Sequence, residues 1–154
     1  MGDVLQRRWV VTLDEFHAFR YERPKEEKWE LIAGEPMMMP PPTLMHQRMS
    51  GNLEAVLNDR LSLVRQDWRA DREISLLLPE DLRFNPEPDV TVIDTAIELG
   101  QLYAERFFFV AEVLSESNRP ETLAGSDKPA PLAAKLAYYQ GHGHCRGVLI
   151  VRQD

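Results

Sequence analysis

Residues 107–114 form an apolar run that contains a single carboxylate, Glu112. A nearly continuous apolar run of this length is suited to a central strand. A carboxylate inside such a strand is costly unless it is paired, protonated or bound to a metal ion. Glu112 therefore needs a partner, unless it lies at the end of the strand and faces solvent beside Ser115.

A second carboxylate, Asp89, opens the preceding predicted strand, over residues 89–93, directly after Pro88. Adjacent strands can place two carboxylates on either side of one cation. Mg²⁺ suits this arrangement because it binds through one or two carboxylates together with water and substrate phosphate, and it lowers the pKa of a bound water. The alternative is that Asp89 is only a turn residue after the proline.

A capping box marks the start of the first predicted helix. Thr12 and Glu15 stand three residues apart, so their side chains can satisfy free backbone amides at a helix N-terminus. We expect a short helix to about residue 20. Two short strands should follow over residues 29–39, with a turn at Gly34.

The longest predicted helix covers residues 46–63, with Thr43 as a possible N-cap. Its apolar residues recur at helical spacing, at positions 49, 53, 56, 57 and 61. A helix with one apolar face of this kind should lie on the sheet.

The remaining elements complete the predicted order. Ile74, Leu76 and Leu78 recur at every second position and predict a strand before the one at 89–93, whereas the polar residues 115–131 predict a long loop. A helical stripe follows from residue 132 to about Gly141, and residues 148–151 form a last strand. The expected order is helix, hairpin, helix, three strands, helix, strand.

Composition indicates one folded domain, residues 1–154. Hydrophobic residues make up 44% of the chain and charged residues 28%, which is ordinary for a globular protein. The 25 acidic residues outnumber the 18 basic ones, which excludes a general polycation and counts weakly against a nuclease. An acidic chain can still bind a phosphodiester where metal ions neutralise its carboxylates and a local basic stripe meets the backbone.

The single cysteine, Cys145, excludes an internal disulfide framework and a cysteine-rich zinc site, and it fits a small core residue in a reducing cytoplasm. No apolar stretch approaches the roughly 20 residues that a membrane span requires. We therefore expect a cytoplasmic protein without a membrane anchor.

Pro88-Asp89 and Glu112-Val113-Leu114 resemble the Pro-Asp and Glu-x-Lys elements of the PD-(D/E)XK nuclease superfamily. The chain departs from that pattern because Leu114 stands where a lysine is expected, so the cation must come from elsewhere. Lys135 is the candidate, on the next predicted helix. Its side chain could either snorkel outward or reach over the sheet toward the carboxylates.

Five sequence blocks in order resemble the Uma-two family of bacterial restriction endonucleases, and they cover nearly the whole chain from Thr12. The blocks are residues 29–35, 41–47, 88–90, 111–115 and 134–139. The resemblance implies an α/β (α+β) restriction-endonuclease-like fold, with a mixed central sheet flanked by helices and an N-terminal helix and hairpin. It also implies that the usual C-terminal strand extension of the family is missing.

Carried over by position, Asp89 and Glu112 match the metal-binding acids of the family and Lys135 its migrated lysine. Glu30 and His46 match motif positions near the cleft. Glu30 could help to bind metal or end a strand in solvent, and His46 could contact phosphate or cap the long helix.

The function that the resemblance implies is metal-dependent hydrolysis of DNA phosphodiester bonds. Asp89, Glu112 and the Val113 carbonyl would hold Mg²⁺ or Mn²⁺, and Lys135 would orient water or neutralise charge. Two alternatives stay open, a noncatalytic module for binding nucleic acid or protein and a metal-dependent hydrolase of another phosphate ester. A homodimer is expected only by analogy with nucleases that cut two strands as pairs.

Overall fold

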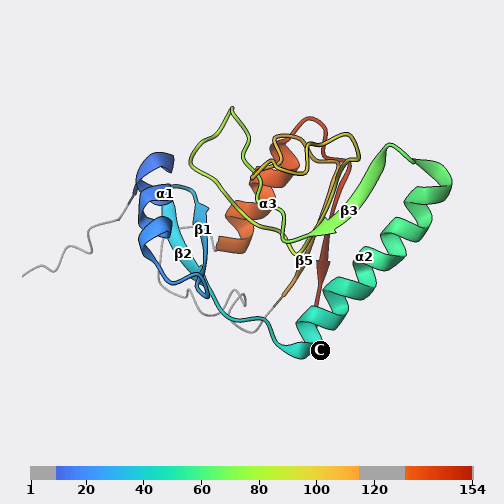
Figure 1. Ribbon diagram of the computed structural model, residues 1–154, viewed down its shortest axis with the longest axis horizontal. Helices are drawn as coiled ribbons and strands as arrows, with labels where there is room; N and C mark the ends of the chain where they lie inside the picture. Colours follow the sequence, from blue (N-terminus) through green and yellow to red (C-terminus); the bar gives the residue numbers. More distant parts are fainter. Residues whose placement is uncertain (1–9, 115–130, 154) are drawn as a thin grey trace, which may run out of the picture.

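A computed structural model describes residues 10–114 and 131–153 of the chain (Figure 1). Three helices lie in these ranges, α1 (Leu13–Glu22), α2 (Leu44–Val64) and α3 (Pro131–Gly141). The strands in the same ranges are β1 (Lys28–Ile32), β2 (Glu35–Met39), β3 (Trp68–Arg72), β4 (Val90–Asp94), β5 (Phe109–Val113) and β6 (Gly147–Val151).

A mixed four-stranded sheet, in the order β3-β4-β5-β6, is the centre of the fold. Strands β3, β4 and β5 are antiparallel neighbours, and β6 runs parallel to β5. The apolar strand β5 is therefore an inner strand, as its sequence predicts. The hairpin β1-β2 forms a separate two-stranded sheet.

The two longer apolar helices cover opposite faces of this sheet (Figure 1). Leu53, Leu57 and Leu61 of α2 pack on a buried cluster that includes Val92 and Ala111. On the other side, Tyr138 and Tyr139 of α3 join the main core, whose members from the sheet include Ile93 and Val110. The fold is thus the predicted α/β class, with a mixed sheet between helices.

The predicted caps and hairpin are confirmed. The Thr12 hydroxyl accepts from the Glu15 amide at 3.2 Å and the Glu15 carboxylate accepts from the Thr12 amide at 2.7 Å, so the capping box is complete. Thr43 caps α2 by accepting from the His46 amide. The hairpin turns at Ala33 and Gly34, both with positive φ.

The predicted strand at residues 74–78 is wrong, and β3 takes its place in the element order. The alternating side chains of residues 74, 76 and 78 do enter the main core, but they do so from an irregular segment. Its backbone bonds go to separate partners, since Leu76 donates to Pro86 and Leu77 donates to Ala104. Sequence patterning missed β3 because this edge strand carries three charged residues in five.

The predicted loop over residues 115–131 lies outside the described residues except at its last position. Pro131 is the first residue of α3, so that helix begins one residue earlier than predicted. Proline is tolerated there because the first helical amide has no partner within the helix. Cys145 packs against the main core, and burial raises the pKa of its thiol. In the part of the chain that the structure describes, none of the helices combines the length and the hydropathy that a membrane span requires.

Candidate active site

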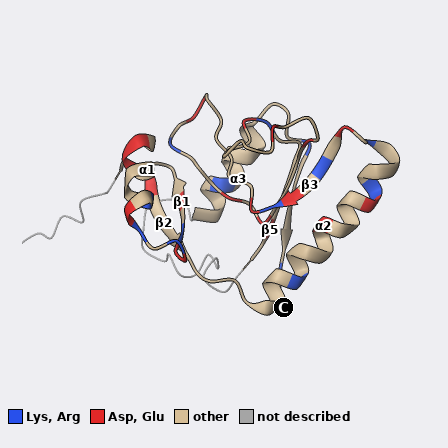
Figure 2. Ribbon diagram, viewed as in Figure 1, with Lys and Arg blue, Asp and Glu red and all other residues tan. Residues whose placement is uncertain are grey.

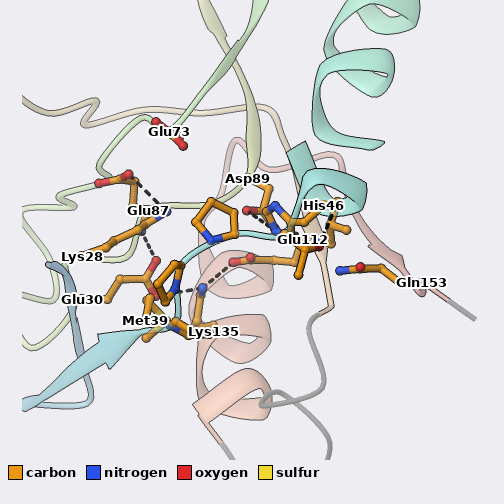
Figure 3. A pocket seen from close by; sticks show the side chains of 15 residues that line it. Lys28, Glu30, Met39, His46, Glu73, Glu87, Asp89, Glu112, Lys135 and Gln153 are labelled. Atoms are coloured by element: carbon orange, nitrogen blue, oxygen red, sulfur yellow. Dashed lines mark hydrogen bonds and ion pairs between the residues drawn. The ribbon is translucent and has the colours of Figure 1, made fainter. Parts of the chain in front are cut away.

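One pocket, with a volume of about 340 Å³, brings together every residue that the sequence nominates for chemistry (Figure 3). These residues are Glu30, His46, Asp89, Glu112, Val113 and Lys135. They arrive from β1, the start of α2, the residue before β4, the strand β5 and the helix α3. Segments far apart in the sequence therefore converge on one cavity beside the end of the central sheet.

Glu112 is buried, with 5% of its surface exposed, so the alternative of a solvent-facing carboxylate at a strand end is wrong. The Lys135 ammonium lies 2.6 Å from Oε1 of Glu112, and the Tyr139 hydroxyl donates to the same oxygen at 2.7 Å. Among the described residues, no hydrogen bond or ion pair to Oε2 is seen, and both contacts to the Glu112 carboxylate are made at Oε1. Helix α3 therefore supplies the partners that a carboxylate in an apolar strand needs, Lys135 and Tyr139.

Lys135 reaches into the pocket and does not snorkel outward, since only 7% of its surface is exposed. Besides Glu112, its Nζ donates to Oε2 of Glu30 at 3.0 Å. Burial alone would lower the pKa of Lys135, but the charges of Glu112 and Glu30 raise it above the ordinary value. The lysine is therefore a fixed positive charge at neutral pH.

Glu30 is almost fully buried, at 1% exposure, so it does not end a strand in solvent. Its Oε2 accepts from Lys135 and its Oε1 accepts from the Glu87 amide at 2.9 Å. Both oxygens are thus occupied by protein donors. Glu30 therefore positions the Lys135 ammonium and the backbone of the segment before β4.

Asp89 is held from two sides. Its Oδ2 accepts from the Val113 amide at 2.6 Å, which ties the residue before β4 to the end of β5. Its Oδ1 lies 3.0 Å from Nε2 of His46. The His46 ring therefore contacts Asp89 and does not cap α2, because the capping side chain is that of Thr43.

Sequence reasoning missed four residues of the site. Lys28, Glu73 and Glu87 also line the pocket, and Tyr139 lies behind it against Glu112. Lys28 pairs with Glu87 at 3.2 Å. The Glu-Pro-Asp sequence around Pro88 was a usable signal for Glu87, whereas Tyr139 was hidden in the apolar stripe of its helix.

The pocket carries more negative than positive charge. Five carboxylates line it, from residues 30, 73, 87, 89 and 112, against the two ammonium groups of Lys28 and Lys135. An excess of carboxylates attracts cations and repels a phosphodiester unless a cation lies between them. Among the residues that the structure describes, no three or more His, Cys, Asp or Glu side chains are grouped so that they could hold a metal ion.

Comparison with known proteins gives a family and a fold. The model of the Uma2 family, described as "Putative restriction endonuclease", matches residues 13–154. A solved structure of "a putative nuclease belonging to DUF820" from Anabaena variabilis ATCC 29413 matches with a TM-score of 0.61 and 20% sequence identity. The match covers 91% of this chain and 74% of that one, and it shows a common fold. No curated protein matches the chain.

Proposed function

Because the chain belongs to the Uma2 family, as its ordered sequence blocks indicate, we propose that it is a metal-dependent endonuclease that hydrolyses phosphodiester bonds of DNA. The observation that carries the proposal is the meeting of Asp89, Glu112 and Lys135 in one pocket. Two carboxylates at the ends of neighbouring strands can hold a divalent cation, and a buried lysine can stabilise negative charge on the phosphate.

The donor set fits Mg²⁺ or Mn²⁺. Carboxylate and carbonyl oxygens suit these hard cations, and Mg²⁺ commonly uses one or two carboxylates and completes its shell with water and phosphate. Glu112 supports the fit because its Oε2 has no donor among the described residues. Asp89, Glu112 and the Val113 carbonyl would hold the ion. Such an ion supplies a Lewis acid and lowers the pKa of a coordinated water.

The chain's own residues would prepare the site for this chemistry. Lys135 brings a positive charge that can orient water or stabilise negative charge developing on the phosphate. Glu30 fixes that charge in place. The Val113 amide and His46 fix the Asp89 carboxylate. The site is therefore preorganised by protein contacts on each of its main groups.

The binding of DNA must overcome the acidic character of the chain, whose net charge is −7. In the described ranges, Figure 2 shows Lys and Arg spread over α1, α2, β3 and α3, interspersed with Asp and Glu. We propose that a cation at Asp89 and Glu112 supplies part of the attraction for the backbone. A homodimer, which would let two sites act on two strands, stays a prediction.

Removal of divalent metal is expected to abolish cleavage. Plasmid DNA incubated with the wild-type protein and Mn²⁺ or Mg²⁺ should be nicked, and an excess of chelator should stop the reaction because the remaining groups lack a Lewis acid. Gel electrophoresis of the plasmid measures this. Added metal in excess of the chelator should restore nicking.

Asp89→Asn serves as the matched control, because its amide oxygen can still accept from the Val113 amide while the ligand charge is lost. Nicking at the wild-type rate in the folded variant would contradict the role of Asp89 as a ligand of the ion. Metal binding together with turnover of small phosphate esters, but intact plasmid, would favour the other phosphate-ester hydrolase. Absence of both metal binding and turnover would favour the noncatalytic module.

A further inference from the structure

A buried phenol touches the carboxylate on which the proposed function depends. The Tyr139 hydroxyl donates to Oε1 of Glu112 at 2.7 Å, and the Tyr139 side chain is fully buried. This contact is additional to the proposed metal ligands, which are Asp89, Glu112 and the Val113 carbonyl. It follows the helical spacing of α3, because Tyr139 stands four residues after Lys135 and so lies on the same helix face.

We propose that Tyr139 is a positioning residue of the metal site, which holds Oε1 of Glu112 so that Oε2 is presented to the cation. The inference rests on the proposed function. Lys135 and Tyr139 both bind Oε1, at 2.6 and 2.7 Å, which leaves Oε2 without a donor among the described residues. Two donors on one oxygen fix the rotation of the carboxylate, and the oxygen without a donor becomes the ligand.

Tyr139 is better suited to this role than Lys135 alone. The lysine is shared between Glu112 and Glu30, and its side chain has many rotatable bonds. The tyrosine ring is rigid and packs edge-on against Phe107, with ring centroids 6.0 Å apart. Outer contacts of this kind orient metal ligands, and their loss typically lowers metal affinity or activity by about 10- to 100-fold.

The neighbouring residue supplies a matched control. Tyr138 is also buried and lies on the same helix, but its hydroxyl accepts from the Leu78 amide at 3.2 Å and its ring stacks on Phe84. Tyr138→Phe therefore removes a buried hydroxyl from α3 without touching Glu112. Any effect of Tyr139→Phe that Tyr138→Phe does not share reports on the contact with the carboxylate.

The test is calorimetric titration of Mn²⁺ into the wild type, Tyr139→Phe and Tyr138→Phe, each checked for an intact thermal transition. We expect Tyr139→Phe to bind Mn²⁺ at least about tenfold more weakly than wild type, and Tyr138→Phe to bind within about twofold of it. Equal affinity of Tyr139→Phe and wild type, or equal losses in both variants, would overturn the proposal. A folded wild type that binds no Mn²⁺ would overturn both the proposed function and this inference, whereas wild-type binding with an unaffected Tyr139→Phe would overturn the inference alone.

A second measurement keeps the proposal testable if Tyr139→Phe does not fold. A cation at Glu112 changes the charge that the Tyr139 phenol faces, so Mg²⁺ should produce a tyrosine absorbance difference in the wild type. The difference should persist in Tyr138→Phe, in which the Tyr139 phenol and its contact with Glu112 are intact. A wild type that binds Mg²⁺ without any tyrosine difference would contradict the proposed contact.

Discussion

Replacement of Lys135 by methionine is expected to lower the free energy of unfolding by about 3–5 kcal/mol, which is the usual cost of removing one partner from a buried ion pair. The lysine contacts both Glu30 and Glu112, and all three side chains are at most 9% exposed. Methionine fills a similar volume but leaves two carboxylates facing each other without a cation. Urea denaturation measures the difference in unfolding free energy.

Lys28→Met is the matched control for this prediction. Lys28 also lines the pocket and pairs with Glu87, but its side chain is 31% exposed, so the same substitution should cost only about 0–1 kcal/mol. Adding Glu30→Gln to Lys135→Met should recover part of the loss by removing one unpaired charge. A Lys135→Met protein as stable as Lys28→Met would contradict the buried ion triad of Lys135, Glu30 and Glu112.

The direction of the pKa shift of Lys135 determines the pH range over which the ion pairs of Lys135 with Glu30 and Glu112 stabilise the fold. Burial lowers the pKa and the two carboxylates raise it, with a net increase above the ordinary value of 10.5. A raised pKa in the folded state means that the contribution is complete below the unfolded value and is lost as the pH rises through the folded value. Titration of the lysine therefore leaves the triad intact at neutral pH and weakens it only in strong alkali.

Glu112→Gln is expected to reduce plasmid cleavage by at least about 10³-fold, because a bound cation contributes several kcal/mol of transition-state stabilisation. The fold should survive the change. The amide oxygen of glutamine can still accept from Tyr139 and Lys135, and Lys135 keeps Glu30 as its counter-charge. Initial rates of nicking and the thermal midpoint, measured on the same preparation, test both parts of the expectation.

Glu73→Gln provides the comparison for Glu112→Gln. Glu73 also lines the pocket, but it is exposed and comes from the segment after β3, outside the proposed ligand set. Its substitution should change the rate by no more than a few fold. An active Glu112→Gln enzyme would remove Glu112 from the mechanism, and equal losses in both variants would point to the charge of the pocket as a whole.

Much of the fold could be predicted because local sequence signals and the tertiary structure agree there. The capping box at Thr12, the turn at Gly34 and the apolar run around Glu112 each specify one local structure. The strand β3 could not be predicted, since an edge strand with charged residues lacks the apolar alternation of a half-buried strand. The alternation at residues 74–78 reports burial correctly, but burial alone does not determine strand pairing.

The site was predictable in part for the same physical reason. Glu112 was found because a carboxylate in an apolar strand is costly and must be compensated. The direction of the Lys135 side chain could not be deduced from helical spacing, which allows both snorkelling and burial. Tyr139 was missed because periodicity shows that a side chain is buried without showing what its hydroxyl contacts.

Calorimetric titration of Mn²⁺ into the wild-type protein and Asp89→Asn tests directly whether Asp89 and Glu112 form a divalent-cation site. We expect a saturable binding isotherm for the wild type and its loss in Asp89→Asn, with the thermal midpoint preserved by the bond from the Val113 amide. Absence of binding to folded wild type, or undiminished binding to folded Asp89→Asn, would contradict this expectation.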